Sequence, residues 1–262
     1  MAQAPNIHPT AIIHPNARVH PSVQIGPYSI IEGDVQVGAN TEIGAQVHLL
    51  GNTTIGEDNR IHTGCVLGDT PQDIKYQGED TCLIIGDGNH IREHVTIHRS
   101  NSLDEDTTLG NGNFLMANSH IGHNSVIGNQ NTLANGALIG GHVILADRAF
   151  ISGNCMIHQF VRIGSYALMQ GGTGITKDLP PFTIAHSINQ ISGLNTVGLR
   201  RAGFAPDIRT ELKKAYHLLF RNKSGKTEAI RQARLQCPSS EATMLIDFVA
   251  ESTRGVCADK GR

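Results

Sequence analysis

Residues 118–160 read NSHIGHNSVIGNQNTLANGALIGGHVILADRAFISGNCMIHQF, and this stretch decides the fold of the chain. An aliphatic residue stands at every sixth position: Ile121, Ile127, Leu133, Ile139, Leu145, Ile151 and Ile157. Apolar residues repeat about every 3.6 positions in an amphipathic helix and every two in a strand, so a period of six fits neither. A period of six is typical of a parallel β-helix, in which each hexapeptide forms one short strand and its corner.

Three hexapeptides per coil would stack residues that are eighteen positions apart. One inward column then consists of Ile121, Ile139 and Ile157. Two positions further on lies an outward column of His123, Gly141 and Gln159. Three more histidines stand within three residues of this column: His120, His142 and His158. Parallel strands lie about 4.8 Å apart, so three coils bring these groups within about 10 Å of one another. We expect one histidine-rich site.

The same six-residue ladder begins at Ile7 and ends at Ile175. It is interrupted at residues 68–82 (GDTPQDIKYQGEDTC). Because Leu67 and Ile85 are eighteen residues apart, the pattern predicts a loop that replaces one or two rungs of a full coil. Polar loops on a rigid solenoid often carry ligand contacts, which makes Asp73 and Lys75 candidates, although an ordinary surface loop is the alternative.

Pro180 and Pro181 cannot continue a sheet, so the sequence predicts a β-helix over residues 1–185. Residues 186–262 are predicted to form a small α-helical domain, with helices that begin near Pro206 and span about 226–236 and 241–251. Eight basic residues crowd its first part: Arg200, Arg201, Arg209, Lys213, Lys214, Arg221, Lys223 and Lys226. They form either a solvated helix face or a dock for an acidic protein or a phosphate.

Composition limits the remaining possibilities. Twenty-nine glycines, no tryptophan and few aromatic residues favour a thin solenoid, and a net charge of −2 gives no indication of nucleic-acid binding. Five cysteines without a Cys-x-x-Cys motif fit a reducing compartment. The amino terminus lacks the features of a signal peptide, and no apolar run is long enough to span a bilayer. We therefore predict a soluble cytoplasmic protein.

Several motifs, taken together and in this order, resemble a known family, the acyl-carrier-protein-dependent UDP-N-acetylglucosamine O-acyltransferases that begin lipid A synthesis. These are QDIKY (72–76), IRE (91–93), TIHR (96–99), HIGH (120–123), GHV (141–143), HQF (158–160), DLPP (178–181) and LRRAGF (199–204). The resemblance covers nearly the whole chain. It implies a left-handed β-helix, an exception to the usual right-handed crossover, and a homotrimer with active sites between subunits.

The resemblance also implies the reaction. A 3-hydroxyacyl chain passes from acyl carrier protein to the glucosamine 3-hydroxyl of UDP-N-acetylglucosamine. Such a transfer needs a base on the hydroxyl and donors for the developing oxyanion, and histidine titrates in the right range for a base. No metal or dissociable cofactor is implied, since 4'-phosphopantetheine arrives on the carrier protein. That acidic carrier would dock on the basic region 200–226.

By the same resemblance, His123 is the general base and Gly141 the oxyanion donor. Substrate-binding roles fall on Gln72, Asp73, Lys75, His120, Asn124, His142, His158, Gln159, Asn195 and Arg201. Gly171 stands where the family sets acyl-chain length, and a glycine there leaves room for a long chain.

Three positions depart from the family pattern. Asn124 stands where the family has an aspartate; its amide oxygen can orient the imidazole but cannot stabilise an imidazolium by charge. Val197 replaces an acid near the nucleotide and Ala202 an arginine, so nucleotide and donor contacts are expected to differ.

Three alternatives remain open from the sequence. Clustered neutral imidazoles can hold zinc, as in the trimeric β-helix carbonic anhydrases, although this loop and helical tail argue against that reading. The same site could acylate the amino group of a 3-amino-sugar nucleotide. A paralogue that kept the fold and lost the activity is the third, because a fold does not fix a function.

Overall fold

The structure is a computed structural model that describes residues 7–222 and 224–259. Two of the expectations fall outside these residues. One is the interpretation of the first five residues as lacking a signal peptide, and the other is Lys223 of the basic region.

Three sheets wrap around one long axis, and nearly all of their strands are parallel and short. The first sheet consists, in spatial order, of β1 (Ile12–Ile13), β4 (Ile30–Ile31), β7 (His48–Leu49), β10 (Val66–Asp69), β13 (Thr96–His98), β16 (His120–Ile121), β19 (Leu138–Ile139), β22 (Met156–Ile157) and β25 (Gly174–Ile175). The second consists of β2 (Arg18–Val19), β5 (Gln36–Val37), β8 (Asn52–Ile55), β11 (Cys82–Ile85), β14 (Thr107–Leu109), β17 (Val126–Ile127), β20 (Ile144–Leu145) and β23 (Arg162–Ile163).

The third sheet has eleven strands and continues into the carboxy-terminal part of the chain. It consists of β3 (Gln24–Ile25), β6 (Glu42–Ile43), β9 (Arg60–Ile61), β12 (His90–Ile91), β15 (Phe114–Leu115), β18 (Thr132–Leu133), β21 (Phe150–Ile151), β24 (Leu168–Met169), β26 (Thr183–Ser187), β27 (Gln190–Leu194) and β28 (Ala258–Asp259). Each coil contributes one strand to each sheet, which makes the molecule a left-handed parallel β-helix, as predicted.

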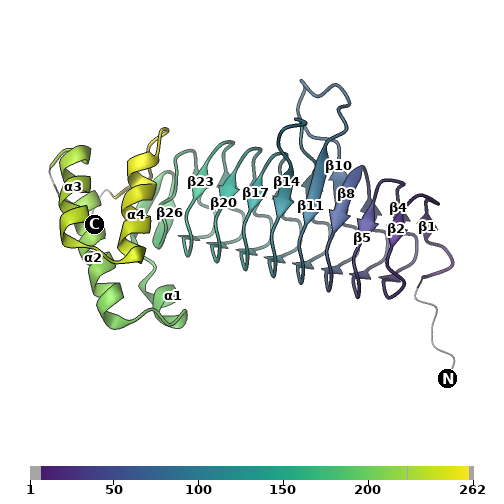
Figure 1. Ribbon diagram of the computed structural model, residues 1–262, viewed down its shortest axis with the longest axis horizontal. Helices are drawn as coiled ribbons and strands as arrows, with labels where there is room; N and C mark the ends of the chain where they lie inside the picture. Colours follow the sequence, from purple (N-terminus) through teal and green to yellow (C-terminus); the bar gives the residue numbers. More distant parts are fainter. Residues whose placement is uncertain (1–6, 223, 260–262) are drawn as a thin grey trace.

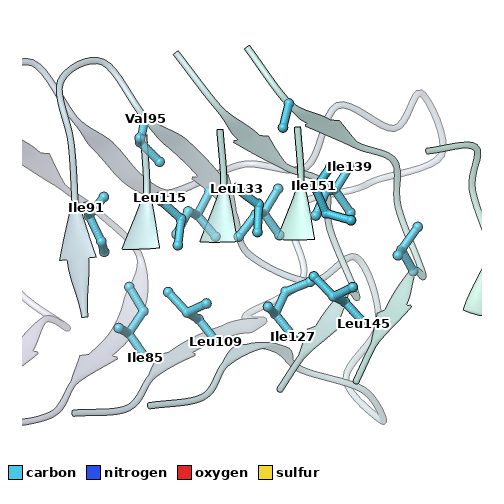
Figure 2. Packing of buried hydrophobic residues seen from close by; sticks show 14 of the residues in the cluster. Ile85, Ile91, Val95, Leu109, Leu115, Ile127, Leu133, Ile139, Leu145 and Ile151 are labelled. Atoms are coloured by element: carbon cyan, nitrogen blue, oxygen red, sulfur yellow. The ribbon is translucent and has the colours of Figure 1, made fainter. Parts of the chain in front are cut away.

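The six-residue ladder forms the interior. Each two-residue strand turns its ladder residue inward and the preceding residue outward, because successive side chains of a strand point to opposite faces. The register confirms the predicted inward column, since Ile121 pairs with Ile139 and Ile139 with Ile157. Ladder residues from Ile25 onward are buried, whereas Ile7 at the open end is 43% exposed. Figure 2 shows ladder side chains from opposite sides meeting in this interior.

The corners explain the many asparagines and glycines. The third residue after a ladder position repeatedly adopts a left-handed backbone conformation, with φ between about 55° and 75°. Glycine enters this region without steric cost, and asparagine tolerates it better than most residues. Asn118, Asn124, His142 and Phe160 all occupy such corners.

The predicted arrangement of the loop at 68–82 is wrong in one respect. Leu67 does not stack on Ile85. It pairs with Ile97, thirty residues on, while Ile97 pairs with Ile121, twenty-four residues on. A regular coil separates such partners by eighteen residues, as it does Ile121 and Ile139. Two loops are therefore inserted between consecutive strands: a long one, 70–81, between β10 and β11, and a short one, 99–106, between β13 and β14. The long loop stands out from the solenoid in Figure 1.

Four helices cover the carboxy-terminal end of the solenoid (Figure 1): α1 (Thr196–Arg201), α2 (Pro206–Phe220), α3 (Lys226–Gln236) and α4 (Ser240–Glu251). They pack around a second core that includes Phe182, Leu212 and Leu245. The antiparallel hairpin β26–β27 joins the solenoid to the helices, and β28 returns to pair with β27. The predicted division at residue 185 falls inside β26.

Within the described residues, no helix is long and apolar enough to cross a membrane. All five cysteines are free of disulfide bonds.

The inward and outward faces of β4 offer a matched test of the ladder. Ile31 is 1% exposed and Ile30 is 36% exposed, although both are isoleucines in the same strand. We predict that Ile31→Ala lowers the free energy of unfolding by about 2–5 kcal/mol, because it leaves a cavity in the core. Ile30→Ala should change it by less than about 1 kcal/mol. Urea unfolding measures both, and equal losses would contradict the assigned faces.

Candidate active site

A cavity of about 510 Å³ opens beside the first sheet, where β16, β19 and β22 end. It is lined by Gln72, His98, His120, Gly122, His123, Leu138, Ile139, Gly140, Gly141, Met156, Ile157 and Gln159. A larger cavity of about 600 Å³ lies over the amino-terminal part of the third sheet. Its histidines include His8, which is exposed and whose Nδ1 lies 2.9 Å from Oγ1 of the neighbouring Thr10. We place the site at the smaller cavity because buried histidines converge there.

Both inserted loops leave the solenoid next to this cavity. They follow β10 and β13, the two strands of the first sheet directly below β16. The loops hold one another, since the Nδ2 of Asn101 donates to the Asp73 carboxylate over 2.6 Å. They also hold the site, since the backbone N–H of Asn101 donates to Oδ1 of Asn124 over 3.0 Å. The first sheet thus supplies the histidines and the loops supply the wall.

His123 is 6% exposed and lies at the centre of the cluster. Its Nδ1 lies 2.8 Å from Oδ1 of Asn124. The other side of the ring faces Gly141 one coil above, as predicted, and so closely that a Cβ at residue 141 would lie 2.8 Å from Nε2. Only glycine leaves room for the ring here.

The Asn124 amide has one arrangement that satisfies all its neighbours. Its oxygen faces the Asn101 N–H and Nδ1 of His123, while its nitrogen donates to Ser100 Oγ and to Glu105 Oε2, each over 3.2 Å. An amide oxygen can only accept, so the imidazole proton must sit on Nδ1. The lone pair of His123 then lies on Nε2, toward Gly141.

His98 and His120 form a second pair, with ring centroids 5.0 Å apart in an edge-to-face arrangement. His120 Nδ1 lies 2.7 Å from Thr96 Oγ1. Burial, together with the neighbouring His98 and His123, lowers the pKa of His120 to about 4. Burial is also the main cause that lowers the pKa of His98. These rings are therefore uncharged near neutral pH.

His142 occupies the corner above Asn124. Its ring lies edge-to-face on His123, with centroids 5.2 Å apart, and stacks on Phe160 at 4.5 Å. Its Nδ1 is 3.3 Å from Glu105 Oε2. Burial and His123 lower the pKa of His142, while the Glu105 carboxylate opposes them.

The structure brings three more of the predicted residues to this corner. Gln72 and Gln159 line the cavity. Asp73 lies beside it, and the backbone N–H of Lys75 and the Asn101 amide lower the pKa of its carboxyl by donating hydrogen bonds. His158, by contrast, is exposed and outside the lining, and its Nδ1 lies 3.1 Å from the carbonyl of Gln159.

Three predicted residues lie elsewhere in the chain. Gly171 follows β24 of the third sheet, on another corner of the solenoid. Asn195 caps α1 by accepting from the Gly198 N–H, and its Nδ2 donates to the Tyr166 carbonyl. Arg201 ends α1 and is exposed.

Sequence reasoning missed four residues of the site: His98, Ser100, Asn101 and Glu105. They belong to β13 or the short inserted loop, whose true register the six-residue pattern did not reveal. The one available signal is that His98 directly follows the ladder residue Ile97, in a sequence (TIHR) that was already part of the resemblance.

The site offers a possible base, His123, next to a backbone N–H that is free among the described residues, that of Gly141. In the first coils prolines occupy the position two residues after the ladder, at Pro9, Pro15, Pro21 and Pro27, which shows that the ladder needs no N–H there. Gly141 holds the same position, and its N–H bonds to no residue that the structure describes. Nε2 of His123 can accept a proton while this N–H stabilises a negative oxygen.

The described part of the chain offers no ready set of metal ligands. Across residues 7–222 and 224–259, no three histidine, cysteine, aspartate or glutamate side chains are grouped to hold an ion.

Two family models match the chain. One, described as UDP-N-acetylglucosamine O-acyltransferase domain 2, matches residues 178–257. The other, described as bacterial transferase hexapeptide (six repeats), matches residues 34–69 and 106–141.

Curated relatives match almost end to end. An acyl-[acyl-carrier-protein]–UDP-N-acetylglucosamine O-acyltransferase of Myxococcus xanthus is 43% identical over 253 residues, covering 95% of this chain and 98% of the relative. The protein of the same name from Burkholderia lata is 43% identical over 257 residues, with the same shares covered.

Solved structures agree. A UDP-N-acetylglucosamine acyltransferase from Bacteroides fragilis superposes with a TM-score of 0.92 at 37% identity, covering 95% of this chain and 98% of that one. That from Francisella novicida gives 0.93 at 34% identity, covering 97% and 95%.

We predict that His120 remains neutral until the pH falls toward about 4, against about 6.5 for an ordinary histidine. Because the unfolded chain takes up this proton at higher pH than the folded chain, stability should fall as the pH drops through that window. NMR of the histidine rings measures the titration, and urea unfolding across the same pH range measures the stability. His120→Gln should flatten the pH dependence, and a His120 ring that titrates near its ordinary value would contradict the prediction.

Proposed function

Since the chain belongs to the acyl-[acyl-carrier-protein]–UDP-N-acetylglucosamine O-acyltransferase family, we propose that His123 and Gly141 carry out its acyl transfer. The protein is an acyltransferase that moves an acyl chain from acyl carrier protein to UDP-N-acetylglucosamine, the first step of lipid A synthesis. One observation carries the assignment of roles. Asn124 holds the proton of His123 on Nδ1, which leaves the lone pair on Nε2, directly beside Gly141.

The reaction follows from that geometry. Nε2 of His123 removes the proton from the glucosamine 3-hydroxyl as its oxygen attacks the thioester carbonyl. A carbon–oxygen bond forms, and the carbonyl oxygen becomes an oxyanion that accepts from the Gly141 N–H. Collapse of this intermediate breaks the carbon–sulfur bond. The imidazolium returns its proton to the departing thiolate, which leaves an ester and free pantetheine thiol.

The neutral histidines bind rather than react. His98 lines the cavity, and its buried Nδ1 has no hydrogen-bond partner among the described residues. His120 lies against His98 and, like it, lines the cavity. Gln72 and Gln159 close the cavity from the loop and from the next coil. Asp73 and Lys75 of the long loop would contact the nucleotide.

The residues on other corners suit a homotrimer. His158, Gly171, Asn195 and Arg201 lie outside the cavity of one protomer, and a neighbouring protomer would bring such residues to it. Exposed apolar side chains on the flat faces support this packing: Val126, Leu138, Ile144, Phe150 and Met156, all at least 40% exposed. Isolated apolar residues are ordinary on a surface, but residues from all three sheets cluster along the same few coils.

The carrier protein would dock on the basic region 200–226. Arg221 is engaged with Asp259 and helps to hold β28. Arg200, Arg201 and Lys213 form no ion pair with a described residue and are free for an acidic partner. The proposal requires no metal or dissociable cofactor, because the pantetheine arrives with the carrier.

Removing the proposed base should abolish most of the activity. Purified protein should convert UDP-N-acetylglucosamine and 3-hydroxyacyl carrier protein to an O-acylated nucleotide, and His123→Ala should reduce kcat by about 10²–10⁴-fold. Mass spectrometry identifies the product. His20→Ala, which removes an exposed corner histidine, is the matched control. Product from the 3-amino-sugar nucleotide alone would point to N-acylation, and loss of activity with a chelator would point to zinc.

Gly171 can be tested as a determinant of acyl-chain length. A Cβ at Gly171 would meet only the Gly153 carbonyl, at 3.5 Å, so the site accepts a side chain without strain. If Gly171 borders the far end of the acyl groove, Gly171→Met should shift the preferred donor to a shorter acyl chain. Competition among carrier proteins loaded with different chains measures the preference. An unchanged preference in a protein of unchanged thermal stability would reject this role.

A further inference from the structure

Glu105 belongs to the short inserted loop and has no role in the reaction described so far. Its side chain is 59% exposed, yet Oε2 makes two contacts inside the site. It accepts from Nδ2 of Asn124 over 3.2 Å and lies 3.3 Å from Nδ1 of His142. A single carboxylate oxygen thus touches both neighbours of the proposed base.

A histidine that takes a proton from a hydroxyl becomes an imidazolium, and a negative charge near its other nitrogen stabilises that state. Asn124 carries no charge. Three carboxylates lie near the cluster. The charge of Asp69 acts on His98, where it opposes the lowering of the pKa, and the Asp73 carboxylate is bound to Asn101 and the backbone of Lys75; the third is Glu105. Glu105 is the one in contact with the partner of His123. The remaining titratable groups around His123 are His98, His120 and His142.

We propose, on the basis of the acyl-transfer function above, that Glu105 is a positioning residue: it orients the Asn124 amide toward His123 and supplies the negative charge that Asn124 lacks.

The orientation follows from hydrogen-bond complementarity. If the Asn124 amide were reversed, its oxygen would face the Glu105 carboxylate and its nitrogen would face the Asn101 N–H, which gives two repulsive pairs. The amide nitrogen would also face Nδ1 of His123 and force the proton onto Nε2. In a serine protease triad, replacing the aspartate by asparagine lowers kcat about 10⁴-fold because it leaves the wrong tautomer. Glu105 prevents that outcome here.

The charge acts through the amide. A chain of hydrogen bonds runs from His123 Nδ1–H to Asn124 Oδ1, and from Asn124 Nδ2–H to Glu105 Oε2. Hydrogen bonds in such a chain polarise one another, so the carboxylate strengthens the acceptor that faces the imidazole. The same oxygen also accepts from Nδ1 of His142 when that nitrogen carries its proton.

If the proposal is right, the site works best with one negative charge shared between positions 105 and 124. Asn124→Asp would set a second carboxylate about 3.2 Å from the first, and two like charges that close destabilise each other. Asn124→Asp combined with Glu105→Gln would restore a single charge, moved one hydrogen bond nearer to the ring. The pair should therefore behave as a unit.

A double-mutant cycle tests the proposal. In Glu105→Gln the new amide oxygen still accepts from Asn124, so the variant removes the charge and keeps the contact. We expect kcat to fall about 10-fold with KM unchanged. The acidic limb of the pH profile of kcat/KM should move to lower pH, because an imidazolium without a nearby carboxylate loses its proton more readily. Asn124→Asp should also lower kcat, and the double variant should recover to within about 3-fold of the parent.

Asp104→Asn is the matched control, since it removes a charge from the same exposed turn without touching Asn124. It should leave kcat and the pH profile unchanged, and thermal unfolding should show that all variants fold. The proposal fails if Glu105→Gln leaves kcat and the pH profile unchanged, as Asp104→Asn should. It also fails if the loss of kcat in the double variant equals the product of the two single losses. In either case, an active parent and an inactive His123→Ala would still support the proposed function. A parent protein that transfers no acyl chain overturns both.

Discussion

The spacing of the parallel ladder is the constraint on which the rest of the molecule depends. Most strands of the solenoid have only two residues, so a coil is held mainly by backbone hydrogen bonds to the coils on either side and by the buried ladder side chains. Parallel strands lie about 4.8 Å apart, so side chains at the same position of successive coils are in direct contact. An imidazole can therefore fill the space in front of the next coil only where that coil has no side chain. His123 and Gly141 meet this condition. The close contact between the proposed base and the proposed oxyanion donor is thus a consequence of coil spacing.

The period of six revealed the solenoid and the columns above residue 109, but it could not reveal the two insertions. These lengthen their coils by twelve and by six residues, as the pairings of Leu67 with Ile97 and of Ile97 with Ile121 show. Both lengths are multiples of six, so the ladder stays in phase although a strand changes its partner. The spacing of eighteen is regular after the second insertion, so the pattern correctly predicted the relative positions of His120, His123, Gly141 and His142. Residues of the inserted loops, such as Asn101 and Glu105, could not be placed, because the six-residue pattern does not show how a loop folds against the coils. The left-handed sense of the coils was predicted from the family resemblance alone, because the repeat period is the same for left-handed and right-handed coils.

Asn124 illustrates how a structural and a chemical requirement can meet in one residue. Its backbone sits at φ 58°, in the left-handed corner position where asparagine is well tolerated. Its side chain is 5% exposed and uses both amide atoms, with two partners on the oxygen and two on the nitrogen. From the sequence, the change from aspartate removes a charge and weakens the base. In the structure, the short inserted loop places a carboxylate against the amide nitrogen, so the charge is displaced by one hydrogen bond.

The charge distribution of the site follows from its burial. A solenoid this thin has no deep interior, yet the loops cover the corner enough to lower the pKa of His98, His120 and His142. Their neutrality matters for the base, because an imidazolium on His123 forms beside rings that add no like charge. It matters for binding as well, since a neutral ring can both donate and accept hydrogen bonds with sugar hydroxyls. A site that collected as many histidines on an open surface would be more highly protonated and would oppose the proton transfer that it serves. In the proposed function, the two inserted loops therefore contribute more than substrate contacts: by covering one corner of a regular solenoid, they surround the proposed base with uncharged rings.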